Sequence, residues 1–343
     1  MLSKFELNIE EIMRRHLLLL VGLLVFLGCQ KKNTCEIPAE IEKMPVEVKA
    51  ERLEHRFFQI KTLPEMKEFL QSEPLFADKF LQRRGYPNEE VLANALLRLA
   101  TDTSITKLVK QTDATFKDLS DVEQDLENAL KHVKYYYPSF HVPRVQTFVS
   151  GLSRDLLVSD SLIVISLDFF VGKKASYRPQ APQYILDRYE KPNLVPSVML
   201  LVSNKFNKTD FVNSMMLEEM IDYGKSYYFV ERMMPCTPDS LIIGYSNQQM
   251  ADVQYNEGKI WAHLIEKELL FETGQFTIRK YIGERPNVPE ISARCPGRIA
   301  TWVGWQIVRK YMETHPNVTL QQLMNEKDAR KILDQSKYHP KQK

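Results

Sequence analysis

Residues 145–167, VQTFVSGLSRDLLVSDSLIVISL, decide the fold class. Both ends of this segment, 145–149 and 162–167, are rich in β-branched and aromatic residues and are bounded by Gly, Ser and Asp. That composition is typical of β-strands. A small sheet is therefore expected in the middle of the chain.

Helical patterns lie on both sides of these strands. In residues 62–138, Thr62 precedes a Pro and Glu65, and Ser120 has Glu123 three residues on, a capping-box spacing. Apolar residues follow at helical intervals. After the strands, Pro- and Gly-bearing loops separate four expected helices. These helices are expected at 208–234, 247–271, 298–314 and 319–333.

Composition agrees with a mostly helical protein that has a sizeable core. The 343 residues are 44% hydrophobic and include only 12 Gly, which favours long helices over tight turns. We predict an α+β fold, predominantly helical, whose globular domain covers 51–343 with a helical part at 51–138 and a sheet-plus-helix part at 139–343. The 46 basic and 44 acidic residues form no sustained run of one sign, so nucleic acid is not expected as a partner.

The N-terminus has the layout of a secretion signal. Arg14 and Arg15 precede the eleven residues 17–27, which are apolar apart from one Gly, and Gly28-Cys29 follows. A membrane-spanning helix needs about 20 apolar residues, so this core is too short to span. Residues 26–29 resemble a bacterial lipobox, whose Cys is lipidated and becomes the first residue of the mature protein. We predict a signal peptide over 1–29 and lipidation, including palmitate, at Cys29.

The segments around this signal refine the prediction. Acidic residues precede Met13, and they do not suit a signal that lies against anionic headgroups, so Met13 is expected to be the true start. Residues 30–50 mix Lys, Glu and Pro without apolar periodicity and are expected to form a spacer between lipid and domain.

Three cysteines remain once Cys29 carries lipid. Cys35, Cys236 and Cys295 form no CxxC or CxxC/HxxxH spacing, which excludes a zinc finger. In an oxidising compartment, Cys236 and Cys295 are the more plausible disulfide because Cys35 lies in the expected spacer. Two buried free thiols are the alternative.

No residue group indicates a particular reaction. The chain has no GxSxG, P-loop or GxGxxG motif and no HExxH. His263 and Glu266 would lie one helical turn apart, as a metal half-site or as part of a solvated helix face. Glu218 and Glu219 are adjacent carboxylates that could act as a pair. On a helix they would point about 100° apart, so they are more often surface charges. Neither a metal nor a cofactor is expected.

Large aromatic residues gather in the C-terminal helices. Trp302 and Trp305 flank Gly304, so two large rings are expected around a close backbone contact. Core packing is the first interpretation, because apolar residues cover nearly the whole circumference of this helix. The second interpretation is an aromatic-lined partner surface formed by Tyr223, Trp261, Trp302 and Trp305.

Several segments together resemble one known family. The sequence is similar over its whole mature length, including the lipid signal, to the gliding-motility lipoprotein GldB family of Bacteroidetes. The segments that carry this similarity are LDFFVG (167–172), YRP (177–179), PQY (182–184), MIDYGK (220–225), PGRIATWVGWQIVRKYM (296–312) and SKYHP (336–340). The resemblance implies a cell-envelope lipoprotein needed for gliding and for the linked type IX secretion machinery. No acidic cluster like the surface-export tags of such lipoproteins follows Cys29, so the periplasmic face of the outer membrane is the expected location.

The family is in turn similar to zinc peptidase-like proteins, in which HExxH on one helix is followed by a Glu ligand on a second. Here residues 197–207 contain neither His nor Glu, and Tyr223 stands at the second-helix position. The resemblance therefore implies a peptidase-like scaffold without its metal, a pseudoenzyme that binds other envelope or gliding-machinery proteins. The alternative is an envelope hydrolase acting on peptide or peptidoglycan through an unrecognised acid-base pair that uses Glu218 or Glu266.

Overall fold

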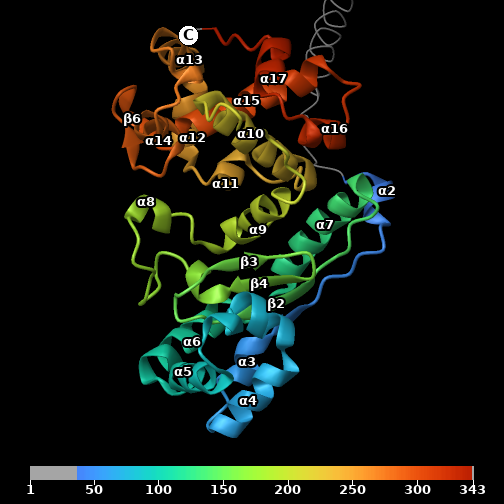
Figure 1. Cartoon of the computed structure of the whole chain (residues 1–343), viewed down its shortest axis with the longest axis vertical. Helices are drawn as coiled ribbons and strands as arrows, with labels where there is room; N and C mark the ends of the chain where they lie inside the picture. The colour runs from blue at the N-terminus through green and yellow to red at the C-terminus, as the bar shows by residue number, and fades with distance from the viewer. Residues whose placement is uncertain (1–36, 342–343) are drawn as a thin grey trace, which may run out of the picture. The chain divides into compact units, whose positions relative to one another are not determined.

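A four-stranded mixed sheet forms the middle of the computed structural model, which describes residues 37–341. Its strand order is β1-β2-β4-β3, and Figure 1 labels β2, β4 and β3 in this sheet. The pairs β1–β2 and β2–β4 are parallel, and β3 runs antiparallel to β4 at one edge. The strands are β1 (Ala50–Arg52), β2 (Arg144–Phe148), β3 (Leu156–Val158) and β4 (Leu162–Ser166). The two strands expected from the sequence are confirmed, and the short strands β1 and β3 are additional.

Both faces of this sheet are covered. All five residues of β4 are buried, as expected for a strand with helices on both sides. One face packs on a cluster that includes Phe57, Phe76 and Phe148, and the other packs on a larger cluster that includes Ile163 and Ile165. This confirms the α+β, mainly helical fold class.

The helices between β1 and β2 in the chain lie on both faces of the sheet. Thr62 caps α4 with a complete capping box with Glu65, as its sequence predicted. The expected box at Ser120 is wrong: Ser120 is the first residue of α7, and its own N–H is accepted by Asp118. The larger core cluster includes the buried face of α7, whereas residues of α3, α4 and α5 form the smaller one. These elements are α3 (Leu53–Phe57), α4 (Leu63–Ser72), η1 (Phe76–Phe80), η2 (Arg83–Gly85), α5 (Glu89–Thr101), α6 (Thr103–Thr115) and α7 (Ser120–Tyr136).

Most of the remaining chain is helical. The helix expected at 208–234 begins only at Met216, and those expected at 247–271 and 319–333 are each interrupted near their middle. A short hairpin, β5–β6, was not expected. The elements are η3 (Leu167–Phe170), α8 (Gln183–Leu186), η4 (Lys191–Asn193), α9 (Leu194–Ser203), α10 (Met216–Met233), α11 (Asp239–Ile243), α12 (Asn247–Tyr255), α13 (Glu257–Glu266), η5 (Leu269–Phe271), α14 (Gln275–Ile282), β5 (Asn287–Val288), β6 (Ser292–Pro296), α15 (Ile299–Thr314), α16 (Leu320–Asn325) and α17 (Ala329–Ser336).

The folded unit begins earlier than the sequence indicated. It starts at Pro38, and helix α2 (Ala39–Glu42) lies within the segment expected to be a spacer. Ile41, Val46 and Val48 are buried in the larger core cluster. Their irregular spacing explains why no helical or strand period revealed them.

The predicted Cys236–Cys295 disulfide is wrong. Cys295 is a free, buried thiol on β6, whereas Cys236 is disulfide-bonded and exposed in the turn that follows α10. Burial raises the pKa of the Cys295 thiol to about 12. Because Cys295 keeps a free thiol in the core, it is not the partner of Cys236.

Cys29, where lipidation is predicted, and Cys35 lie outside the described residues. In the described part of the chain, no helix combines the length and the apolar composition needed to cross a membrane.

Candidate functional site

Helices α10 and α15 cross with their backbones in contact. A Cβ placed on Gly304 would lie 1.8 Å from the carbonyl oxygen of Met220, and one on Gly224 would lie 2.4 Å from the carbonyl oxygen of Gly304. Only residues without a side chain permit this approach. The crossing confirms the close backbone contact expected at Gly304, and it fixes α10, which carries Glu218, Glu219 and Tyr223.

The same crossing buries the tryptophans. Trp302 and Trp305 are 1% and 0% exposed, and Trp261 is 8% exposed. The indole N–H of Trp305 donates to Glu231 at 2.9 Å. The partner surface predicted from the three tryptophans is therefore wrong, because close helix packing encloses their rings in the core. Of the four residues proposed for it, only Tyr223 is exposed, at 43%.

The two segments compared with a peptidase metal site do lie side by side. The amide of Asn207, at the end of the 197–207 window, donates to the carbonyl of Asp222 at 2.8 Å and to the hydroxyl of Ser226 at 3.0 Å. The side chains that α9 buries are apolar apart from Ser203. The buried side chains of α9 thus include Val198, Met199 and Val202, on the helix that would have to supply two metal ligands.

Tyr223 offers little to a metal ion. Burial, with the neighbouring Tyr227 and Glu219, raises the pKa of its phenol above the ordinary value of 10. The ring stacks on Tyr227 with centroids 6.4 Å apart. A protonated phenol is a poor ligand for zinc, which is held by thiolate, imidazole or carboxylate. The pair α9 and α10 therefore provides packing at this position rather than a ligand set.

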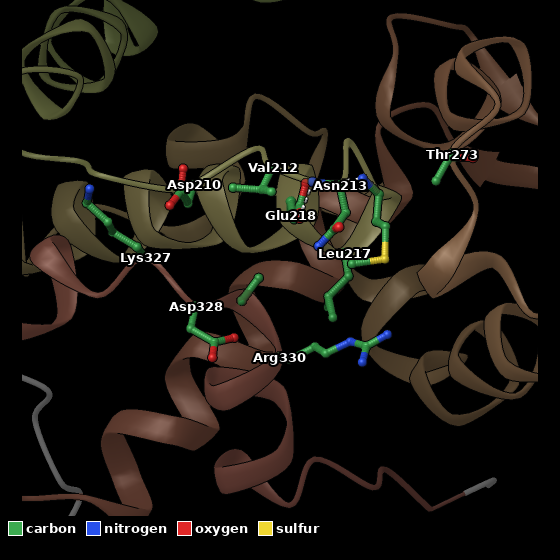
Figure 2. A pocket seen from close by; sticks show the side chains of 11 residues that line it. Asp210, Val212, Asn213, Leu217, Glu218, Thr273, Lys327, Asp328 and Arg330 are labelled. Atoms are coloured by element: carbon green, nitrogen blue, oxygen red, sulfur yellow. Dashed lines mark hydrogen bonds between the residues drawn. The ribbon is translucent and has the colours of Figure 1, made fainter.

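A surface hollow of about 660 Å³ lies where α10 begins. Met215, Leu217, Glu218 and Ala329 are its buried lining residues. Figure 2 shows Val212, Asn213 and Glu218 on one side, facing Asp328 and Arg330 on the other. We call this site the α10 hollow; its remaining lining residues are Asp210, Thr273 and Lys327.

Apolar side chains stand exposed at Val212, which lines the α10 hollow, and at Phe211, Phe271 and Phe276, which lie within three residues of a lining residue in the chain. Val212 and Phe276 are 76% and 80% exposed, and Phe211 and Phe271 about half exposed. The Arg330 guanidinium lies 4.7 Å from the centroid of the Phe271 ring. Exposed apolar groups that gather in this way mark binding surfaces more often than isolated ones do.

The walls of the α10 hollow are held by hydrogen bonds behind its surface. The N–H of Lys208 donates to the carbonyl of Met324, and that of Met216 to the carbonyl of Glu272. Lys225 is fully buried, and its ammonium donates to the carbonyls of Glu326 at 2.7 Å and Met324 at 3.3 Å. A cation at the carbonyl end of a helix is favourable, here at the end of α16.

This buried ammonium predicts a distinct pH dependence of stability. Burial lowers the pKa of Lys225 to about 8 from its ordinary 10.5, against the opposing effect of Asp222 and Glu326. Between these values the unfolded chain binds more protons than the folded one, so stability rises with pH. The difference in unfolding free energy between wild type and Lys225→Met should increase by about 1.4 kcal/mol per pH unit from pH 8 to 10. Urea unfolding at several pH values measures it, and parallel profiles would contradict it.

The comparison with protein families decides the assignment. The family model described as "Gliding motility protein GldB" matches residues 34–340, nearly the whole chain. The chain belongs to the GldB family. No curated protein and no solved structure matches it significantly. GldB is a gliding-motility family, and its designation as a lipoprotein family supports attachment to a membrane through lipid.

A second cluster of ligand-type residues lies elsewhere in this GldB family member. Glu54, His55 and Asp113 bring ligand atoms within 4.8 Å of one another. The Arg52 guanidinium already occupies the cluster, donating to Glu54 at 2.7 Å and to Asp113 at 3.0 Å. Thr147 donates to both carboxylate oxygens of the fully buried Glu54. The cluster is therefore a partly buried ion-pair network that joins β1, α3, β2 and α6.

The acid-base candidates are not assembled into a catalytic group. Glu218 accepts the backbone N–H groups of Asn213 and Met215, at 3.2 and 3.1 Å, as a cap at the start of α10. Glu266 is exposed, and His263 bonds the hydroxyl of Tyr281 at 3.0 Å. The half-site expected from His263 and Glu266 thus gains no third ligand on the described elements.

The α10 hollow was not predicted from the sequence. Of its lining residues, Glu218 was a candidate, whereas Val212 and Arg330 were not. The hollow is assembled from three segments that are distant in the chain, 210–218, 273 and 327–330. One usable signal was the run Phe211-Val212 between polar residues, an apolar pair in a loop.

Proposed function

We propose that this GldB family member is a non-catalytic cell-envelope lipoprotein that supports gliding motility and the associated type IX secretion machinery as a scaffold or assembly factor. In this proposal Cys29 carries the lipid, and the protein faces the periplasm from the outer membrane. The observation that carries the proposal is the apolar packing of α9 against α10. The position that a metallopeptidase would give to ligands is occupied by hydrophobic core.

The physical argument concerns ligand chemistry. A catalytic zinc site needs three protein ligands and an open position for water. Val198, Met199 and Val202 carry no thiolate, imidazole or carboxylate, the groups that hold zinc in proteins, and the phenol of Tyr223 is protonated at neutral pH. Neither a Lewis acid nor an activated water can be held by these side chains.

The α10 hollow is the surface that we assign to the protein partner. Its exposed apolar residues suit burial against another protein, and its rim combines aromatic rings with arginine, which are enriched where interfaces gain most affinity. Arg330 makes no ion pair with any described residue and is exposed beside Phe271. We infer an envelope protein that inserts an apolar side chain and pairs a carboxylate with Arg330.

Gliding of complemented cells tests this assignment. In a gliding strain that lacks its own copy, Val212→Asp and Phe276→Asp should each greatly reduce cell speed, because placing a charge in an apolar contact typically weakens binding at least about tenfold. Tyr255→Asp is the matched control, since Tyr255 is 62% exposed on α12 outside the hollow. Immunoblots check that all three accumulate equally. Wild-type speed in both rim variants would refute the partner surface.

A further inference from the structure

The edge strand β3 leaves backbone groups without partners. The N–H of Ser159 donates to Leu162, and that of Ser166 donates to Asp155. In this antiparallel register, the backbone N–H and C=O of Leu157 point toward β4, like those of residues 155 and 159. The backbone groups of Leu156 and Val158 therefore point away from the sheet. Asp155 accepts the N–H of Leu156. The carbonyl of Leu156 and both groups of Val158 have no hydrogen-bond partner among residues 37–341.

A groove of about 560 Å³ runs along this edge. Lys79, at the end of η1, lies on one side, and Leu201 and Lys205, around the end of α9, lie on the other. Figure 1 shows α9 beside β3. Leu201 is 38% exposed, an apolar side chain available to a bound molecule. We call this feature the β3 groove.

The β3 groove is cationic. Lys79, Arg154 and Lys205 line it, against the single carboxylate of Asp160. The guanidinium of Arg154 donates only to the backbone carbonyls of Lys79 and Phe80, so its charge has no carboxylate partner in the described structure. Lys205 pairs with Asp160 at 2.6 Å. Two of the three positive charges thus remain uncompensated.

We propose that the β3 groove binds an extended, acidic segment of another protein, which adds to the sheet as a fifth strand beside β3. Backbone groups of the segment would pair with Leu156 and Val158, and alternate side chains would enter the groove. Its carboxylates would face Lys79 and Arg154. Strand addition of this kind derives affinity from the main chain and specificity from alternate side chains. The proposal does not depend on the α10 hollow, which lies elsewhere on the protein.

A second copy of the chain is a poorer occupant. Each copy would bring the same excess of positive charge to the shared edge, and like charges facing each other across a strand pair are destabilising. An acidic segment removes that repulsion. The charge of the groove therefore selects a different partner rather than self-association.

Peptide selection on the full-length protein in detergent tests the proposal. A displayed library of random dodecapeptides should yield binders that alternate apolar with Asp or Glu residues. Val158→Pro removes the outward N–H without breaking the β3–β4 ladder, a place where edge strands tolerate proline. It should weaken the selected peptides at least about tenfold, the effect of losing one or two hydrogen bonds. Lys79→Glu, which touches no ladder group, should do the same, whereas Lys107→Glu on α6 is the control of equal charge change.

Modified peptides give the decisive readout. N-methylation of alternate residues should abolish binding in one register and leave it intact in the other, which a mere charge attraction would not produce. Failure to enrich any peptide, or wild-type affinity of the selected peptides for the Val158→Pro and Lys79→Glu variants, would overturn the proposal. A Val158-dependent dimer in light scattering would instead assign the edge to a second copy.

Discussion

Gly304→Ala is expected to destabilise the protein by about 3 kcal/mol or more, the upper part of the range for overpacked cores. The added methyl group would lie 1.8 Å from the carbonyl oxygen of Met220, a backbone atom that no rotamer change can move. Helices α10 and α15 would have to separate, and the packing of Trp302 and Trp305 would open with them. Thermal and urea unfolding of the purified variant measure the effect.

Gly85→Ala is the matched control for this substitution. Gly85 lies in η2, its backbone does not have a positive φ, and an added Cβ would meet nothing within 4 Å. Its stability should change by no more than about 0.5 kcal/mol. A Gly304→Ala protein as stable as Gly85→Ala would show that the two helices do not cross as closely as described.

Asp168→Ala is expected to cost about 2–4 kcal/mol at neutral pH, because one buried and one partly buried N–H group lose their acceptor. The Asp168 carboxylate accepts the N–H of Leu152 at 2.7 Å and that of Ser150 at 3.2 Å. It thereby holds a loop in which Gly151 and Leu152 both have positive φ, a conformation that costs energy for a leucine. Asp334→Ala, at an exposed position of α17, is the control and should change little.

The same carboxyl group should impose a pH dependence below neutrality. Burial raises the pKa of Asp168 to about 6 from 3.8, despite the hydrogen bonds that lower it. The folded state then binds more protons than the unfolded state between these values. The proton-linked contribution of Asp168 to the free energy of unfolding is on the order of 3 kcal/mol below pH 4, and it is lost as pH rises through 6. Asp168→Asn should remove this dependence, and an unchanged profile in Asp168→Asn would contradict the assignment.

Long, strongly patterned elements could be predicted from the sequence. The helix expected at 298–314 is α15 to within one residue, and both β-branched runs are strands. The helix α9 was not predicted, because Pro196 interrupts its apolar run and prolines are uncommon inside helices. The structure places Pro196 within the first turn, where a missing N–H costs nothing. The three-residue strand β3 has too few residues to show a period.

The candidate site was harder to predict because tertiary contacts decide it. Both interpretations of Trp302 and Trp305 fit the same pattern, and only the partner helix α10 determines that their rings are enclosed. The lack of His and Glu in residues 197–207 could be read directly from the sequence, because it depends only on residue identity. The α10 hollow depends on loops that no local spacing brings together.

The zinc content of the purified full-length protein is the most direct test of the central claim that α9 and α10 form a packed scaffold and not a metal site. After equilibration with zinc and removal of the excess, elemental analysis should find far less than one zinc per chain, because catalytic zinc requires three protein ligands that α9 and Tyr223 do not supply. One zinc per chain, lost when Tyr223 is changed to Phe, would contradict the account and favour a hydrolase.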